Sequence, residues 1–298
     1  MACAVAFLIH LIPLFLPRDV PAQNLAIARA IPDSAQRAKT LKPLKTNEKA
    51  TGAELREAAE LLREGAPLDA YELAREAERR EPGAVETQLL LVKLCHEQRM
   101  KRCEEEAFTK AEKLAPGDAR AELLRADIQE RQGDVRGALE SVKKAYEKEP
   151  ELAGVGVRYG RLLSSVGRGD EAVEVLRGLE GKLGRGRILV EEGLVRVAQG
   201  RMEEAKELFG RAVEADPRLV MGHYHLGMTA FRVGDVRGAE EALREADRLD
   251  MSDMRSLSAL CEVQRQSGQK DAMLATRMDL ERRFPERMDA VRTACRAE

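Results

Sequence analysis

Four series of residues recur along this chain about every 34 positions, and this periodicity constrains the fold more than any other feature of the sequence. A unit repeated at a fixed spacing buries its apolar face against its neighbours, so the sequence predicts a stack of repeats. The series are Pro82, Pro116, Pro150, Pro217 and Pro285; Gly65, Gly133, Gly167, Gly200, Gly234 and Gly268; Ala70, Ala138, Ala172, Ala205 and Ala239; and Ala77, Ala111, Ala145, Ala212 and Ala246.

Each of these residue types has a physical role in a pair of helices. Glycine ends the first helix in a left-handed conformation. The alanines let neighbouring helices approach closely, and proline ends the second helix because it cannot continue the hydrogen-bond ladder. Between these marks apolar residues follow helical spacing, as in Ala205, Leu208, Phe209 and Ala212. Aromatic residues make up only 3% of the chain, which disfavours an all-β fold.

The segments 200–217 and 222–250 resemble the tetratricopeptide repeat (TPR) family, whose unit is a pair of antiparallel helices. In the second segment, Leu226, Gly227, Gly234, Ala239 and Ala246 lie at the signature spacings of the family. The resemblance covers residues 51–287 and implies an all-α, right-handed superhelical solenoid of about seven repeats. The expected repeats are 51–84, 85–118, 119–152, 153–185, 186–219, 220–253 and 254–287.

The two ends of the chain carry different signals. Residues 2–17 are almost wholly apolar and too short for an ordinary membrane span, so residues 1–22 are expected to be a signal peptide, with a retained membrane anchor as the alternative. Residues 23–50 show weak periodicity and a basic surplus, and are expected to be a flexible linker, with a basic arm that contacts anionic lipid or polymer as the alternative. Residues 288–298 are expected to form a C-terminal capping helix. These features predict an exported protein, periplasmic or secreted.

A partner-binding surface is expected on the first helices of repeats five and six. The family resemblance implies that first helices line the concave face, and here they place an apolar and aromatic cluster on it. Exposed apolar patches commonly mark partner sites, although the same side chains could instead pack within their own helix pairs. The candidate residues are Val190, Leu194, Val197, Met221, Tyr224, Met228 and Phe231.

The cysteines give two different expectations. Cys95 and Cys103 flank the turn of repeat two, where Arg99 replaces the turn glycine. They are a candidate disulfide pair in an oxidising compartment, and the sequence leaves open whether they are oxidised. Cys261 and Cys295 are 34 positions apart and would occupy equivalent sites on successive helices. Such sites lie about 8–10 Å apart, too far for an unstrained disulfide, so buried free thiols are expected there.

Charge and residue spacing argue against several function classes. The net charge of −2 disfavours a nucleic-acid binder. His223 and His225 are two positions apart and cannot chelate one ion from one helix face, so no metal or other cofactor is expected. No catalytic constellation is found, and the chain is not expected to be an enzyme. The sequence therefore favours an exported scaffold that binds a protein or peptide, in assembly of an envelope complex for secretion, pili or polysaccharide export. The alternative is a structural spacer or self-associating module.

Overall fold

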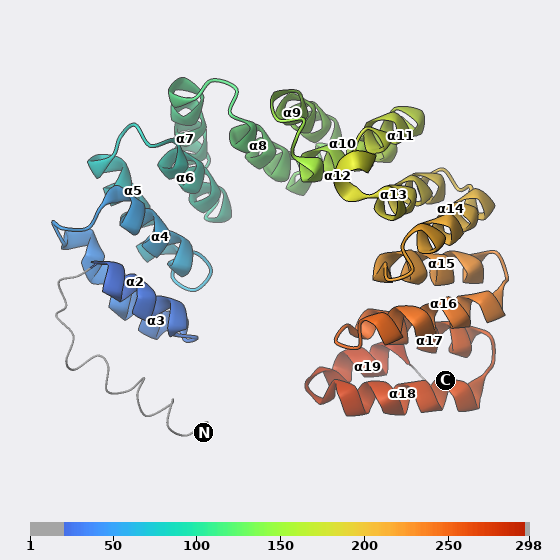
Figure 1. Cartoon of the computed structure of the whole chain (residues 1–298). Coiled ribbons are helices and arrows are strands. Elements are labelled where there is room, and N and C mark those ends of the chain that lie inside the picture. Colours follow the sequence, from blue (N-terminus) through green and yellow to red (C-terminus); the bar gives the residue numbers. More distant parts are fainter. Residues whose placement is uncertain (1–20, 296–298) are drawn as a thin grey trace. The chain divides into compact units, whose positions relative to one another are not determined.

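The computed structural model describes residues 21–295, and in this range the chain forms helices and no strand (Figure 1). Of the expected signal peptide, residues 1–20 lie outside the described residues. The chain divides into two compact units, one ending at Gln132 and one beginning at Gly133, and each is described by itself. None of the helices between residues 21 and 295 combines the length and hydropathy that a membrane span requires.

The first unit consists of helices joined by short turns. The second helix of each pair buries alanines, which let α4 pack closely on α5 and α6 on α7 around one apolar cluster. The elements are α2 (Pro21–Ala30), α3 (Ser34–Leu41), the 3-10 helix η2 (Lys42–Thr46), α4 (Gly52–Leu62), α5 (Pro67–Arg80), α6 (Val85–Glu97), α7 (Lys101–Leu114) and α8 (Ala119–Arg131).

The second unit continues with the same helix-turn-helix pattern. Adjacent helices pack as pairs, most extensively α13 on α14 and α15 on α16 (Figure 1). The elements are α9 (Val135–Lys148), α10 (Ala153–Ser165), α11 (Gly169–Arg177), α12 (Glu180–Leu183), α13 (Arg185–Ala198), α14 (Met202–Ala215), α15 (Val220–Arg232), α16 (Val236–Leu249), α17 (Met254–Gln266), α18 (Lys270–Arg283), the 3-10 helix η3 (Pro285–Arg287) and α19 (Met288–Ala294).

These helix pairs begin and end close to the repeat boundaries expected from the sequence, and the prediction of an all-α fold of helix pairs is confirmed. The turn glycines from Gly133 to Gly268 have positive φ, between 72° and 86°. Arg99 takes the same place in repeat two with φ of 58°, the one non-glycine residue with positive φ in the described chain. Gly65 does not have positive φ; a Cβ there would lie 2.2 Å from Ser34 Cβ, so this glycine permits close packing on α3.

The structure differs from the expected flexible linker at residues 23–50. Helices α2 and α3 pack against α4, and Leu25, Leu41 and Leu44 are buried in the same cluster as the first repeat. One basic residue of the segment binds backbone carbonyls. Arg37 donates from Nη1 to the Leu61 carbonyl at 3.0 Å and from Nη2 to the Ile31 carbonyl at 2.7 Å. The segment is thus an additional helix pair that covers the apolar face of α4.

The last helix of the described chain is fastened to the repeat before it. Helix α19 packs on α17 and α18, with Val291 fully buried. A disulfide joins Cys261 to Cys295, whose Cα atoms are 5.5 Å apart. This corrects the expectation of free thiols. The expected distance between the two cysteines applies when the second one lies on a full-length helix of the next repeat. Instead, α19 has only seven residues, follows a 3-10 turn and lies directly against α17. Residues 296–298 of the expected cap lie outside the described residues.

Candidate functional site

The expected partner-binding face on α13 and α15 is only partly open to solvent. Val190 is 1% exposed and packs in the cluster around Phe209, which corrects its assignment to a partner-facing position. Leu194 and Val197 are half-buried against that same cluster. Tyr224 and Phe231 are half-buried against the next cluster, which includes Leu243 and Leu257. Met228 is also half-buried, and Met221 is 40% exposed.

Charged and ring contacts hold the backbone of this face in place. Arg161 on α10 binds Glu191 on α13 through two hydrogen bonds of 2.9 and 2.6 Å, and Glu191 is 2% exposed. Next to it, the His225 ring stacks on Phe209 at 5.4 Å between centroids. Burial lowers the pKa of His225, and the charges of Arg161 and Arg255 lower it further against the opposing effect of Glu191. The neutral imidazole is therefore favoured within this packed region.

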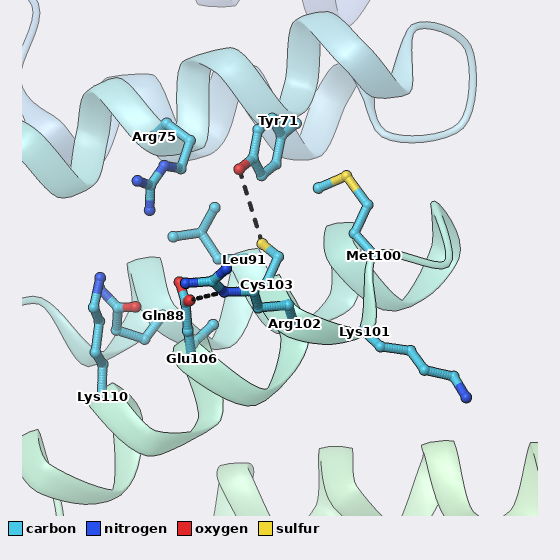
Figure 2. Close-up of a pocket in the computed structure, with 11 residues that line it drawn as sticks. Tyr71, Arg75, Gln88, Leu91, Met100, Lys101, Arg102, Cys103, Glu106 and Lys110 are labelled. Atoms are coloured by element: carbon cyan, nitrogen blue, oxygen red, sulfur yellow. Dashed lines mark hydrogen bonds and ion pairs between the residues drawn. The ribbon is translucent and has the colours of Figure 1, made fainter.

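A separate pocket of about 560 Å³ opens between α5, α6 and α7 in the first unit (Figure 2). Its wall carries Tyr71, whose hydroxyl donates to Cys103 Sγ at 3.9 Å. A disulfide joins Cys103 to Cys95 across the turn, so the pocket wall includes the bridged turn of repeat two. The other lining residues are Arg75, Gln88, Leu91, Met100, Lys101, Arg102, Glu106, Ala107 and Lys110.

Two more hollows lie on the same unit, the second beside this pocket and the third beside the second. The second, about 520 Å³, shares Tyr71 and Arg75 with the first and is also lined by Lys45, Glu72, Glu76, Glu78 and Arg79. The third, about 560 Å³, shares Lys45 and Glu72 with the second and is also lined by Lys39, Lys42, Pro43 and Thr46. We call these three hollows together the basic row.

Sequence reasoning did not find the basic row. It assigned Lys39, Lys42 and Lys45 to a mobile segment, whereas α3 and η2 place them beside α5. The signal in the sequence was the surplus of basic residues in 23–50. That surplus did not indicate which helices these residues would lie beside, because their position depends on the packing of α2 and α3 against α4. In the described part of the chain, no group of three or more His, Cys, Asp or Glu side chains could hold a metal ion.

Comparison with known proteins identifies the repeats. A family model described as a tetratricopeptide repeat matches residues 105–153 and 190–253. Comparison with curated protein sequences finds no match.

Three solved structures have a similar fold. Yeast Tom70 has a TM-score of 0.62 and 14% identity, with 90% of this chain and 58% of that chain covered, so this chain spans little more than half of Tom70. A tetratricopeptide repeat protein from Parabacteroides merdae has a TM-score of 0.57 and 17% identity, with 82% and 97% covered. PilW, described as a widely conserved type IV pilus biogenesis factor, has a TM-score of 0.51 and 19% identity, with 70% and 97% covered.

At these identities the solved structures show the fold alone. They agree with the two segments matched by the family model and with helix pairs whose first helix ends at a left-handed turn residue in a common phase. The chain therefore has the tetratricopeptide repeat fold, and its residues 105–153 and 190–253 match the model of that family.

Proposed function

We propose that this chain is a non-catalytic scaffold that holds a peptide or helix of a partner protein on the face formed by α13 and α15. The observation that carries the proposal is a group of apolar side chains on α15 that are partly accessible to solvent. Met221 is 40% exposed, and Tyr224, Met228 and Phe231 are half-buried on the same helix. Flexible methionines and amphipathic aromatic rings suit a surface that receives an apolar helix face.

The partner is proposed to belong to an exported assembly, such as a secretion, pilus or polysaccharide-export complex. Two observations support this step. The apolar run of residues 2–17 is typical of a signal for export. The fold is similar to that of PilW, which is described as a pilus biogenesis factor.

The test compares crosslinked partners recovered from envelope fractions by wild type and by variants of the face. Met221→Glu/Met228→Glu places charge on the proposed contact, and Tyr224→Ala/Phe231→Ala removes its aromatic rings. Leu68→Glu is the control, because Leu68 is 70% exposed in the other unit. Partners should be lost with both double variants and retained with Leu68→Glu, while circular dichroism shows that helicity is kept. Equal recovery from all four proteins would contradict the proposal.

A second candidate, self-association through the last helix pair, is favoured by one observation. Leu274 is 46% exposed and Met278 is 70% exposed, and they lie one turn apart on α18. Light scattering over a range of concentrations tests it: a dimer that dissociates in Met278→Glu supports self-association, and a monomer at every concentration excludes it.

A further inference from the structure

We propose that the basic row of the first unit binds an extended acidic segment of a partner protein. Its lysines and arginines would receive carboxylates, and its apolar wall would receive the intervening side chains. This site lies on different helices from the α13 and α15 face, so the inference goes beyond the proposed function and does not rest on it.

Charge is the first argument. Eight basic residues line the row against four carboxylates, a surplus of four positive charges in a chain whose net charge is −2. A local field opposite to the charge of the whole chain attracts an acidic ligand and raises its association rate. The basic residues are Lys39, Lys42, Lys45, Arg75, Arg79, Lys101, Arg102 and Lys110, and the carboxylates are Glu72, Glu76, Glu78 and Glu106.

The two outermost hollows are each lined by a cation that no carboxylate between residues 21 and 295 neutralises. Lys39 lines the third hollow and Lys101 lines the first; both side chains are exposed and make no ion pair within the described residues. The other cations are already engaged, as in the 2.9 Å pair of Lys45 with Glu72 and the 2.6 Å pair of Lys110 with Glu78. An incoming carboxylate therefore gains most at Lys39 and Lys101, at opposite ends of the row.

The wall of the first hollow adds apolar surface (Figure 2). Tyr71, Leu91 and Met100 supply the apolar part. Gln88 is 1% exposed and donates from Nε2 to Glu78 Oε1 at 3.1 Å, which fixes its amide so that Oε1 is the atom left without a donor. Because Oε1 is itself buried, this wall offers a ligand its apolar surface and not the amide of Gln88.

The interleaved carboxylates favour a peptide over a phosphate polymer. A hydrogen bond from Arg79 is the main cause that lowers the pKa of Glu76 to about 2, so this side chain stays anionic at neutral pH. Glu72 and Glu106 lie exposed in the same walls. A polymer with a phosphate on every unit would be repelled by these glutamates. A peptide can instead place N–H donors beside the glutamates and carboxylates beside the lysines. Three adjoining hollows also suit an extended chain better than one compact molecule.

The experiment selects binders from displayed random dodecapeptides on the full chain and then measures labelled peptides by fluorescence anisotropy. The test variant is Lys39→Glu/Lys101→Glu. The matched control is Lys144→Glu/Lys148→Glu, which changes the net charge equally at exposed lysines of α9 in the second unit. Selected peptides should combine Asp or Glu with apolar residues. Their affinity should fall by about tenfold or more in the test variant, stay within about twofold in the control, and weaken with added salt.

Peptides without an acidic excess, or equal affinity for wild type and the test variant, would overturn the proposal. Oligodeoxythymidylate and phosphatidylglycerol vesicles are assayed alongside. Charge-dependent binding of either, with no acidic peptide selected, would also overturn it in favour of a phosphate-bearing ligand. Met221→Glu/Met228→Glu is included because it should leave peptide affinity at the basic row unchanged. Failure at this site is then distinguishable from failure of the α13 and α15 face.

Discussion

At the scale of single residues, the turn of repeat two differs from the later turns because it has arginine in place of glycine. Arg99 occupies a left-handed conformation where later repeats have glycine, and the Cys95–Cys103 disulfide closes the same turn. A side chain in this conformation costs energy because its Cβ crowds the following carbonyl. The bridge offsets that cost by restricting the unfolded chain.

Arg99→Gly is expected to stabilise the first unit by about 1 kcal/mol, because relief of the left-handed strain exceeds the extra backbone entropy of glycine. Gly234→Ala, at a φ of 86°, is the inverse change and should destabilise the second unit by about 1–2 kcal/mol. Urea unfolding of each variant beside wild type measures both. A destabilised Arg99→Gly protein would show that the arginine side chain contributes more than its backbone costs.

At the scale of helices, close packing depends on positions where a Cβ would not fit. A Cβ on Gly193 of α13 would lie 2.5 Å from Phe209 Cε1 on α14. One on Gly227 of α15 would lie 2.7 Å from Leu243 Cγ and 3.0 Å from the Ala239 carbonyl oxygen on α16. These two helix pairs pack more extensively than any others in the chain, so the absent side chains set how closely the helices approach.

Gly227→Ala is expected to destabilise the second unit by about 1–3 kcal/mol, because the Ala239 backbone cannot move aside as a flexible side chain could. Gly210→Ala is the matched control. Gly210 lies within α14 and a Cβ there meets nothing within 4 Å, so alanine should stabilise by about 0.5–1 kcal/mol. Thermal unfolding followed by circular dichroism should show opposite shifts. A loss of stability in both variants would indicate that helical glycine itself, rather than packing, is required.

The sequence predicts elements well where the repeat is regular and poorly where one residue type replaces another. Most helix bounds from residue 51 onward follow from the glycine and proline series. Repeat four is the exception, because no series proline ends it: α11 stops at Arg177 and the short helix α12 follows. The N-terminal pair could not be predicted because residues 23–50 carry none of the four residue series, although Leu25, Leu41 and Leu44 are buried in the cluster of the first repeat. The Cys261–Cys295 bridge could not be predicted because the 34-residue repeat period gives no sign that the final helix is shorter than the others.

The candidate sites could also be predicted only in part. The phase of the repeat assigned Met221, Tyr224 and Phe231 to one helix, and α15 contains all three. Depth of burial depends on neighbouring side chains, and Val190 is buried by Phe209 and its neighbours. The basic row could not be predicted, because it combines η2 with α5 and α7, which are far apart in the sequence and were not all expected to be helical.

At the scale of the whole molecule, stability is expected to be local. In a repeat protein each helix pair contacts its neighbours, so folding free energy is a sum of pair and interface contributions. The first unit has one apolar cluster running from Leu25 to Ile128, and the second has its own clusters around Phe209 and Leu260.

Leu44→Ala is therefore expected to cost about 2–5 kcal/mol, because Leu44 is fully buried, and to act within the first unit only. Hydrogen exchange should show lost protection in α2 to α5 and unchanged protection in α13 to α18. Equal loss in both units would mean that the chain unfolds as a single cooperative body. Retained protection in both would mean that α2 and α3 contribute little to the first repeat.

The Cys261–Cys295 bridge has a consequence for how the chain withstands proteolysis. It encloses the turn at Gly268, which lies between α17 and α18. An endoprotease that nicks this turn would leave both pieces covalently joined, and an exopeptidase entering from the carboxyl end would meet the crosslink at Cys295 before reaching the last repeat. In reductant the same nick would release a fragment, so the final repeat should become cleavable into separate pieces only after its thiols are freed.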